Sequence, residues 1–284
     1  MAYENICMLI DYRKQREEMM KKMKNYRAVM AVLIGTLILS FFCTVSVQAE
    51  VEKFSMGAGL GFAPDYEGSD DYTGVPMLYA NAQWSSGRYV KLAGSKLSAN
   101  IITHDVFRFG PVANYRLGRD DAISVDDSKV KKMEQVDDSF ELGAFAGMEI
   151  DNWIFMVEAL SDVSDGHDGF VLTLSGGYTW QVNNSWTLSL GASTSYADDD
   201  YMSSFFDVDL RDSQRSGLNT YDADSGFKDV GCNVAAVYKW TDLWSIRTSA
   251  GCTRLLNDAE DSPVVDDRGD ENQLHLGVMA IYTV

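Results

Sequence analysis

The chain has 284 residues and a formal net charge of −18, from 24 Lys and Arg against 42 Asp and Glu. Residues 1–49 contain 7 of these basic residues and 4 of the acidic ones, so the remainder has 17 against 38 and a charge of −21. This acidity argues against nucleic acid or an anionic surface as a partner. Beyond residue 49 only Cys232 and Cys252 remain, which excludes a disulfide-rich scaffold.

The first 49 residues are predicted to be an N-terminal extension and a cleaved signal peptide. Residues 21–27 are basic, residues 28–47 are apolar, and residues 47–49 form a cleavage site of small residues. The mature protein is therefore expected to begin at Glu50. The apolar run is also long enough for a membrane anchor, but nothing after it resembles another spanning helix.

Apolar residues alternate with small or polar ones in the first half of the mature chain, residues 50–284. A period of two is typical of strands, and here one face would meet lipid. Such strands are expected at residues 54–62, 76–84 and 107–117. Residues 89–102 are broken at Gly94-Ser95 and are predicted to form two short strands.

Three hairpins and a closing strand complete the pattern. The hairpins are expected within residues 140–160, 169–196 and 232–252, and residues 273–284 alternate to the last position. All six tryptophans flank short turns, which is typical of an aromatic girdle: Trp84, Trp153, Trp180, Trp186, Trp240 and Trp244. We predict an all-β fold, a closed antiparallel transmembrane β-barrel of about 12 strands with short periplasmic turns and long extracellular loops. Its location would be the outer membrane of a Gram-negative bacterium.

The long loops are polar and acidic. Carboxylates of the first loop are weak candidates for a calcium site, because calcium prefers hard oxygen ligands; they are Asp65, Glu67, Asp70 and Asp71. The favoured interpretation is a solvated rim whose charge is balanced by divalent ions of the lipopolysaccharide layer. Pro64, Gly68 and Pro263 are expected to set loop shape.

No catalytic residue and no cofactor are predicted. The three histidines, His104, His167 and His275, stand near no nucleophile motif, and the chain has no Walker loop, dinucleotide fingerprint or zinc spacing. A serine–histidine hydrolase site that uses His275, which is expected to face the lumen, stays open as an alternative.

Three groups of residues resemble a known family. They are Pro64, Asp65, Tyr66, Gly68, Ser69 and Tyr72 after Gly59-Leu60-Gly61; Ser216, Gly217 and Leu218; and Asp258, Asp261, Ser262 and Pro263. With these motifs the mature chain is similar to the MipA/OmpV family of outer-membrane proteins. The resemblance implies a barrel, and a scaffold role between a lytic transglycosylase and a murein synthase, with no shared catalytic residues. The chain departs from the expected pattern at Val284, where a terminal aromatic residue would be usual.

A non-enzymatic scaffold or binding barrel is therefore the leading hypothesis, with outer-membrane lipid, lipopolysaccharide and murein-remodelling enzymes as partners. A narrow cation-preferring channel or uptake porin is the alternative, favoured by polar residues on the inward face and acidic mouths, and a surface adhesin comes third. A hairpin that turns at Asp242 would oppose Cys232 and Cys252 directly on the lipid face. A disulfide is chemically permitted there, against the alternative of two free thiols.

Overall fold

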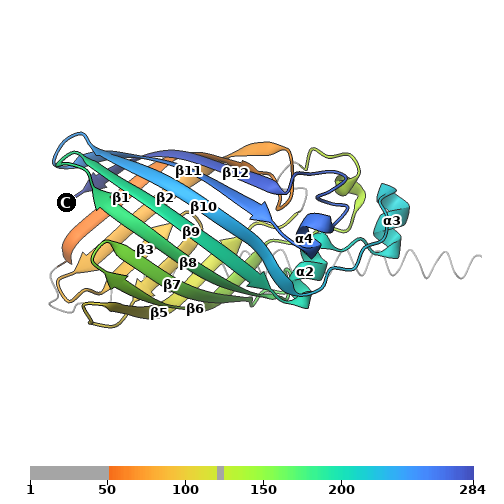
Figure 1. Cartoon of the computed structure of the whole chain (residues 1–284), viewed down its shortest axis with the longest axis horizontal. Coiled ribbons are helices and arrows are strands. Elements are labelled where there is room, and N and C mark those ends of the chain that lie inside the picture. Colours follow the sequence, from red (N-terminus) through yellow and green to blue (C-terminus); the bar gives the residue numbers. More distant parts are fainter. Residues whose placement is uncertain (1–50, 120–124) are drawn as a thin grey trace, which may run out of the picture. The chain divides into compact units, whose positions relative to one another are not determined.

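The computed structural model describes residues 51–119 and 125–284 (Figure 1), and these residues form a closed antiparallel barrel. The strands follow one another around the barrel in chain order, and β12 pairs with β1 to close it. The predicted fold class and the strand number of twelve are confirmed. The predicted signal peptide, residues 1–49, and the expected start at Glu50 lie outside the described residues.

The strands have the positions that the alternation predicts. They are β1 (Val51–Pro64), β2 (Tyr72–Trp84), β3 (Tyr89–Ala93), β4 (Lys96–Asn100), β5 (Phe107–Arg116), β6 (Ser139–Ile150), β7 (Trp153–Asp162), β8 (Phe170–Gln181), β9 (Trp186–Ala197), β10 (Gly226–Lys239), β11 (Trp244–Leu255) and β12 (Asn272–Thr283). The predicted break between the two short strands is confirmed, and Gly94 there has a φ of +62°, which favours glycine.

Side chains alternate between the lipid face and the lumen along each strand. On β1, Leu60 is 69% exposed whereas Ser55, on the opposite face, is 5% exposed. Successive side chains of a strand point to opposite sides, so one register fixes the whole lipid face. The closing register joins Met56 to Tyr282 and Leu60 to Val278. Among the described residues, no helix has the length and apolar character of a membrane span.

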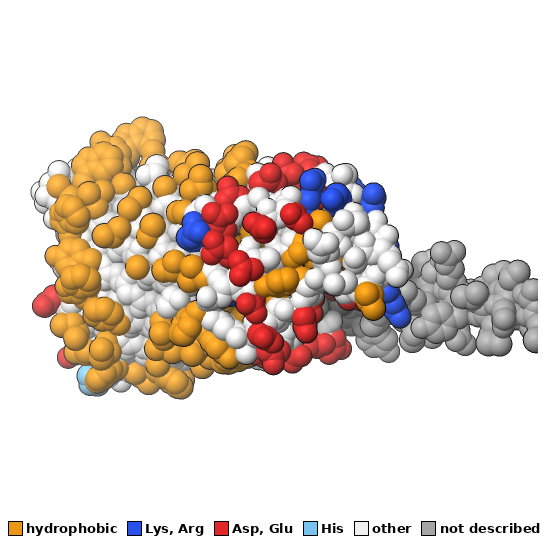
Figure 2. Space-filling view, turned by 45° about the vertical axis from the view of Figure 1, so that its right-hand side comes forward, with side chains coloured by type: hydrophobic (Ala, Val, Ile, Leu, Met, Phe, Trp, Pro, Cys, Tyr) orange, Lys and Arg blue, Asp and Glu red, His pale blue; other side chains and the backbone are white. Residues whose placement is uncertain are grey.

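The two ends of the barrel differ. The turn end has the short connections and the end of β12, while the loop end has the helices, as Figure 1 shows. Five of the six tryptophans are well exposed beside the short turns, and Trp84 is half-buried. In Figure 2, hydrophobic side chains cover the wall toward the turn end and acidic side chains gather over the loops. This distribution supports the predicted girdle.

The barrel wall is low at the β3–β4 hairpin, because these strands have only five residues each. Pairing between β2 and β3 stops at Tyr79, so the described part of β2 has no strand neighbour on that side beyond this point. The Leu78 carbonyl accepts a bond from Gly94 on this edge. Pro76, two residues away, has the same orientation and lacks the N–H that would be unpaired there.

The predicted long loops contain short helices and are packed. Residues 125–138 contain η1 (Val130–Lys132), the segment after β9 contains α2 (Asp199–Phe206) and α3 (Leu210–Ser216), and the segment after β11 contains α4 (Asp258–Asp261). We call residues 65–71, 125–136, 199–223 and 257–271 the cap. The cap covers the loop end.

Candidate functional site

The three motif groups of the sequence come together in the cap. Tyr66, Leu218 and Val264 belong to one buried cluster, with exposed fractions of 5%, 3% and 0%. Gly68 has a φ of +99°, and a Cβ atom there would lie 2.6 Å from Val265. The predicted solvated rim holds for Asp70, Asp261, Asp266 and Asp267, which are exposed, but not for Asp65, which is buried. The apolar residues of these segments form a core of their own.

Polar side chains fix the first motif loop to β12. The Gln273 side chain accepts a hydrogen bond from the Gly68 amide at 3.1 Å and donates one to the Ser69 carbonyl at 3.0 Å. The Tyr72 hydroxyl accepts from the Leu274 amide at 3.1 Å. Since β12 is the closing strand, this loop is held next to the place where β12 pairs with β1 and closes the barrel.

The other motif residues cap and join the helices. Ser216 is buried and donates to the Asp212 carbonyl at 2.6 Å, and Gly217 ends α3 with a φ of +74°. Ser262 donates to the Phe206 carbonyl at 2.6 Å. Asp258 accepts from the Asp224 amide at 2.8 Å. The remaining positions are a half-buried Pro64 at the end of β1, an exposed Asp261 and a buried Pro263.

Helix α2 lies across the loop end. Asp198 caps its first turn by accepting from the Tyr201 amide, a preferred role for this residue type. The helix buries four large side chains, Tyr201, Met202, Phe205 and Phe206. They pack with inward-facing residues of β8, β9 and β11, namely Val171, Ala197 and Leu255. The apolar face of α2 thus fills the top of the lumen.

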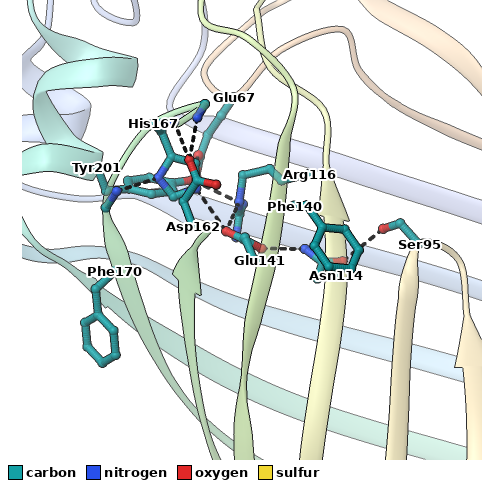
Figure 3. Close-up of polar contacts among 12 residues, drawn as sticks. Glu67, Ser95, Asn114, Arg116, Phe140, Glu141, Asp162, His167, Phe170 and Tyr201 are labelled. Carbon is teal, nitrogen blue, oxygen red and sulfur yellow. Dashed lines mark hydrogen bonds and ion pairs between the residues drawn. The ribbon is translucent and has the colours of Figure 1, made fainter. Parts of the chain in front are cut away.

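A buried polar network lies directly under α2 (Figure 3). The Tyr201 hydroxyl donates to the Glu67 carboxylate at 2.5 Å and accepts from the Arg116 guanidinium at 3.1 Å. Lys228 of β10 forms ion pairs with Glu67 and with Asp229, the latter at 2.7 Å. Residues from β5, β10, α2 and the β1–β2 loop therefore meet across the lumen.

The network continues along the wall to β4. Glu141 is fully buried and accepts from Arg116 at 2.7 Å and from Asn114 at 2.6 Å. His167 lies 3.1 Å from Glu141 through Nε2, while its Nδ1 accepts from the Gly169 amide. Since Nδ1 accepts, Nε2 carries the proton and donates to Glu141. Asn114 in turn accepts from the Ser95 hydroxyl at 3.0 Å.

Burial and neighbouring charges fix the protonation states of Glu67 and Tyr201. Burial alone would raise the pKa of Glu67, but the charges of Lys228 and Arg116 lower it below its ordinary value. Burial raises the pKa of the Tyr201 hydroxyl, which stays protonated as a donor. A buried ion pair whose partners are all hydrogen-bonded is costly to break, because either charge left alone stays desolvated. We call Glu67, Arg116, Glu141, His167, Tyr201 and Lys228 the lock.

The weak metal candidates do not form a metal site. Glu67 is committed to the lock, Asp65 is buried and accepts from the Asp126 amide at 3.3 Å, and Asp70 is exposed. Repulsion from Asp70 adds to burial in raising the pKa of Asp71. Within the described ranges, no group of three or more His, Cys, Asp or Glu residues could hold a metal ion.

The histidines lack the partners of a hydrolase site. His104 accepts from the amides of Val106 and Phe107, and His167 is buried in the lock. His275 lines the lumen as predicted, but it has no hydrogen-bond partner among the residues that the structure describes. Among the described residues, no serine hydroxyl is hydrogen-bonded to a ring nitrogen of these histidines.

The two cysteines are directly opposed on β10 and β11, so the predicted register is confirmed. Both are free thiols in this structure, and the disulfide that the sequence permits is not formed. Cys232 is exposed on the same face as Val234 and Tyr238. The pair lies on the lipid face, away from the lock.

Below the lock, the lumen contains a cavity of about 1050 Å³. Its lining extends to Ser55, Ser245 and Thr283 at the turn end. Lys91 and Arg247 are the Lys and Arg residues of this lining. The lumen is therefore filled by the lock and the cap at the loop end and hollow toward the turn end.

Sequence reasoning missed the lock as a network, although Glu67 was a candidate metal ligand and Arg116 was among the polar residues expected on the inward face. A signal was present, because Glu141 is a charge between Phe140 and Leu142 on a predicted strand. Buried charges in such positions are paired. Which distant residue provides the partner depends on the fold of the cap, and α2 was not predicted.

Comparisons with known proteins found one family model and several solved structures. The family model described as MltA-interacting protein MipA matches residues 56–284. No curated protein matches the chain. A solved KdgM porin in complex with disordered oligogalacturonate is 13% identical, with a TM-score of 0.40 and coverage of 81% of this chain and 98% of that one.

Two further solved structures are similar in fold. A bacterial polysaccharide outer membrane secretin is 10% identical, with a TM-score of 0.43 and coverage of 81% of this chain and 97% of that one. The translocator domain of autotransporter NalP from Neisseria meningitidis is 10% identical, with a TM-score of 0.37 and coverage of 91% and 97%. These likenesses concern the fold alone.

Proposed function

Because the chain belongs to the family of the MltA-interacting protein MipA, we propose that it is a non-enzymatic scaffold that holds murein-remodelling enzymes at the inner side of the outer membrane. The partners in this proposal are a lytic transglycosylase and a murein synthase. Short turns of outer-membrane barrels face the periplasm and long loops face outward. The turn end would then be the docking side.

The observation that carries the proposal is the closed loop end. The lock joins β5, β6, β10 and α2 across the lumen, and the apolar face of α2 lies above it. A barrel closed on the outside offers its rim and its lumen to the periplasm. The absence of a paired serine and histidine in the described residues supports a binding role.

Two features speak against a cation-preferring channel. The cap and lock fill the outer end of the lumen, and the cavity beneath is lined by Lys91 and Arg247 rather than by carboxylates. Cations would meet repulsion at that level. A channel would require the lock to open.

Site-specific photocrosslinking in intact envelopes tests the proposal. A photoreactive residue would replace Asp151, Asn184 or Asp242 at the short turns, and Leu210, which is 72% exposed on α3, would be the matched control at the other end. We expect a lytic transglycosylase or a murein synthase, identified by mass spectrometry, from the turn positions only. Crosslinks to these enzymes from Leu210, or none from any turn, would overturn the proposal.

A further inference from the structure

The lumen cavity contains two cations that lack a carboxylate partner. Four other cations on inward positions of the strands are ion-paired: Lys96 with Glu158, Arg108 with Glu149, Arg116 with Glu141, and Lys228 with Glu67. For Lys91 and Arg247, the described part of the chain provides neither an ion pair nor a hydrogen bond. Among the residues that the structure describes, the two cations thus lack an ion pair in a chain with 42 Asp and Glu.

The two cations share one space. Lys91 is on β3 and Arg247 on β11, with β2, β1 and β12 between them. Through the strand pairing, Lys91 lies at the level of Ser55 on β1 and Arg247 at the level of Gly59. Lys91, Arg247 and Tyr79 all line the same cavity.

The lining of the cavity suits a polar anion. No Asp or Glu belongs to it, and its lining includes the inward-facing residues Tyr79 and Ser193, which carry hydroxyl groups. Its volume of about 1050 Å³ is comparable with that of small-molecule pockets, which typically measure roughly 300–1,000 Å³. Guanidinium and ammonium groups bind carboxylate and phosphate oxygens through charge-assisted hydrogen bonds.

We propose that the lumen is a binding site for a small organic anion, with its carboxylate or phosphate group held between Lys91 and Arg247. The ligand enters from the turn end, because the cavity reaches Ser245 and Thr283 there and the lock fills the opposite end. This site does not depend on the scaffold role. The ligand would enter at the turn end, which is also the end where the proposed protein partners would dock.

Isothermal titration of the protein extracted from outer membranes in a neutral detergent tests this site. The probes are glucose 1-phosphate and glucuronate, and glucose is the uncharged control. We expect at least one of the two anions to bind, glucose to bind at least tenfold more weakly, and binding to weaken as NaCl is raised. Binding of glucuronate alone would identify a carboxylate ligand, and binding of glucose 1-phosphate alone would identify a phosphate ligand.

Substitutions of Lys91 and Arg247 test whether these two residues bind the anion. Lys91→Gln and Arg247→Gln should each weaken anion binding about tenfold, which corresponds to about 1.4 kcal/mol. Lys239→Gln, at the exposed turn after β10, should leave it unchanged. All variants should keep the heat-modifiable folded band, because neither cavity cation has an ion pair or a hydrogen bond to lose among the described residues.

The proposal is overturned by any of three results. These are no binding of either anion at millimolar concentration, equal binding of glucose, and unchanged binding in the folded double variant K91Q/R247Q.

Discussion

The Tyr201 hydroxyl donates a 2.5 Å hydrogen bond to the Glu67 carboxylate, and this bond joins helix α2 to the loop between β1 and β2. The two residues are 134 positions apart in the chain. Tyr201 contacts both cations of the barrel wall, Arg116 and Lys228, and Glu67 is ion-paired with Lys228. The cap is thereby fastened to the wall by charge-assisted bonds as well as by its apolar face.

Tyr201→Phe removes the hydroxyl and keeps the ring. A hydrogen bond to a charged group contributes about 1.5–3 kcal/mol, so we expect cap closure to weaken by that amount. In planar bilayers, openings should become at least about tenfold more frequent than in the wild-type protein. Tyr238→Phe, on the lipid face near the turn end, is the matched control and should stay silent. Equal behaviour of the two variants would contradict a role of Tyr201 in closure.

Lys228→Met leaves the carboxylates of Glu67 and Asp229 without their cation. Removing one partner of a buried ion pair typically costs about 3–5 kcal/mol, and Lys228 is only 5% exposed. We expect the folded band on a gel to be lost at a clearly lower temperature. Lys239→Met, half-exposed at a turn, should change stability by less than about 0.5 kcal/mol. Adding Glu67→Gln should restore part of the loss, and the absence of any rescue would argue against this pairing.

Acid should open the cap. The pKa of Glu67 is lowered from 4.5 because Lys228 and Arg116 outweigh the effect of burial. A carboxyl group with a lowered pKa stabilises the folded state above its unfolded pKa, and this contribution is lost as the pH falls through the folded value. We expect bilayers to stay silent from neutral pH to about 4.5 and to conduct below it.

Two other loop carboxyl groups also have shifted pKa values. The pKa of Asp127 is lowered, since its bonds from Arg268 and from backbone amides outweigh the effect of burial, and it acts in the same direction as Glu67. Asp71 acts in the opposite direction, because burial and neighbouring acids raise its pKa. The variant Glu67→Gln separates these contributions. If it kept the full wild-type response to acid, Glu67 would not be the group responsible.

The barrel could be predicted from the sequence because each strand shows its own pattern. A lipid face needs alternating side chains within one strand, as from Phe54 to Phe62, and no knowledge of the neighbours is required. The strand number also followed, since short and long connections must alternate. Even the register of Cys232 with Cys252 could be derived from one turn.

The cap could not be predicted in this way. Its core combines Tyr66, Leu218 and Val264 from segments more than 40 residues apart, and no local period marks such a cluster. Acidic composition suggested solvation, although Asp198 and Asp209 serve instead as helix caps. Pairing of buried charges such as Lys228 and Glu67 is a property of the assembled fold.

The mature protein is predicted to begin at Glu50. The basic residues, the apolar run and the small residues at 47–49 coincide as a signal peptide requires. Amino-terminal sequencing of the protein from purified envelopes should therefore start at Glu50. Recovery of a chain that still contains residues 28–47 would show a membrane anchor instead.

The opposed cysteines provide a test of the barrel register. Cys232 faces Cys252 across β10 and β11, and both are free thiols in the structure. Directly opposed residues of antiparallel strands have Cα atoms roughly 4.5–5.5 Å apart, which is within the range of a disulfide. We expect two alkylated thiols in the unreduced protein, and a single linked peptide by mass spectrometry after mild oxidation. Cys232→Ser should abolish that peptide, and an oxidised wild-type protein that still alkylates at both positions would contradict the register.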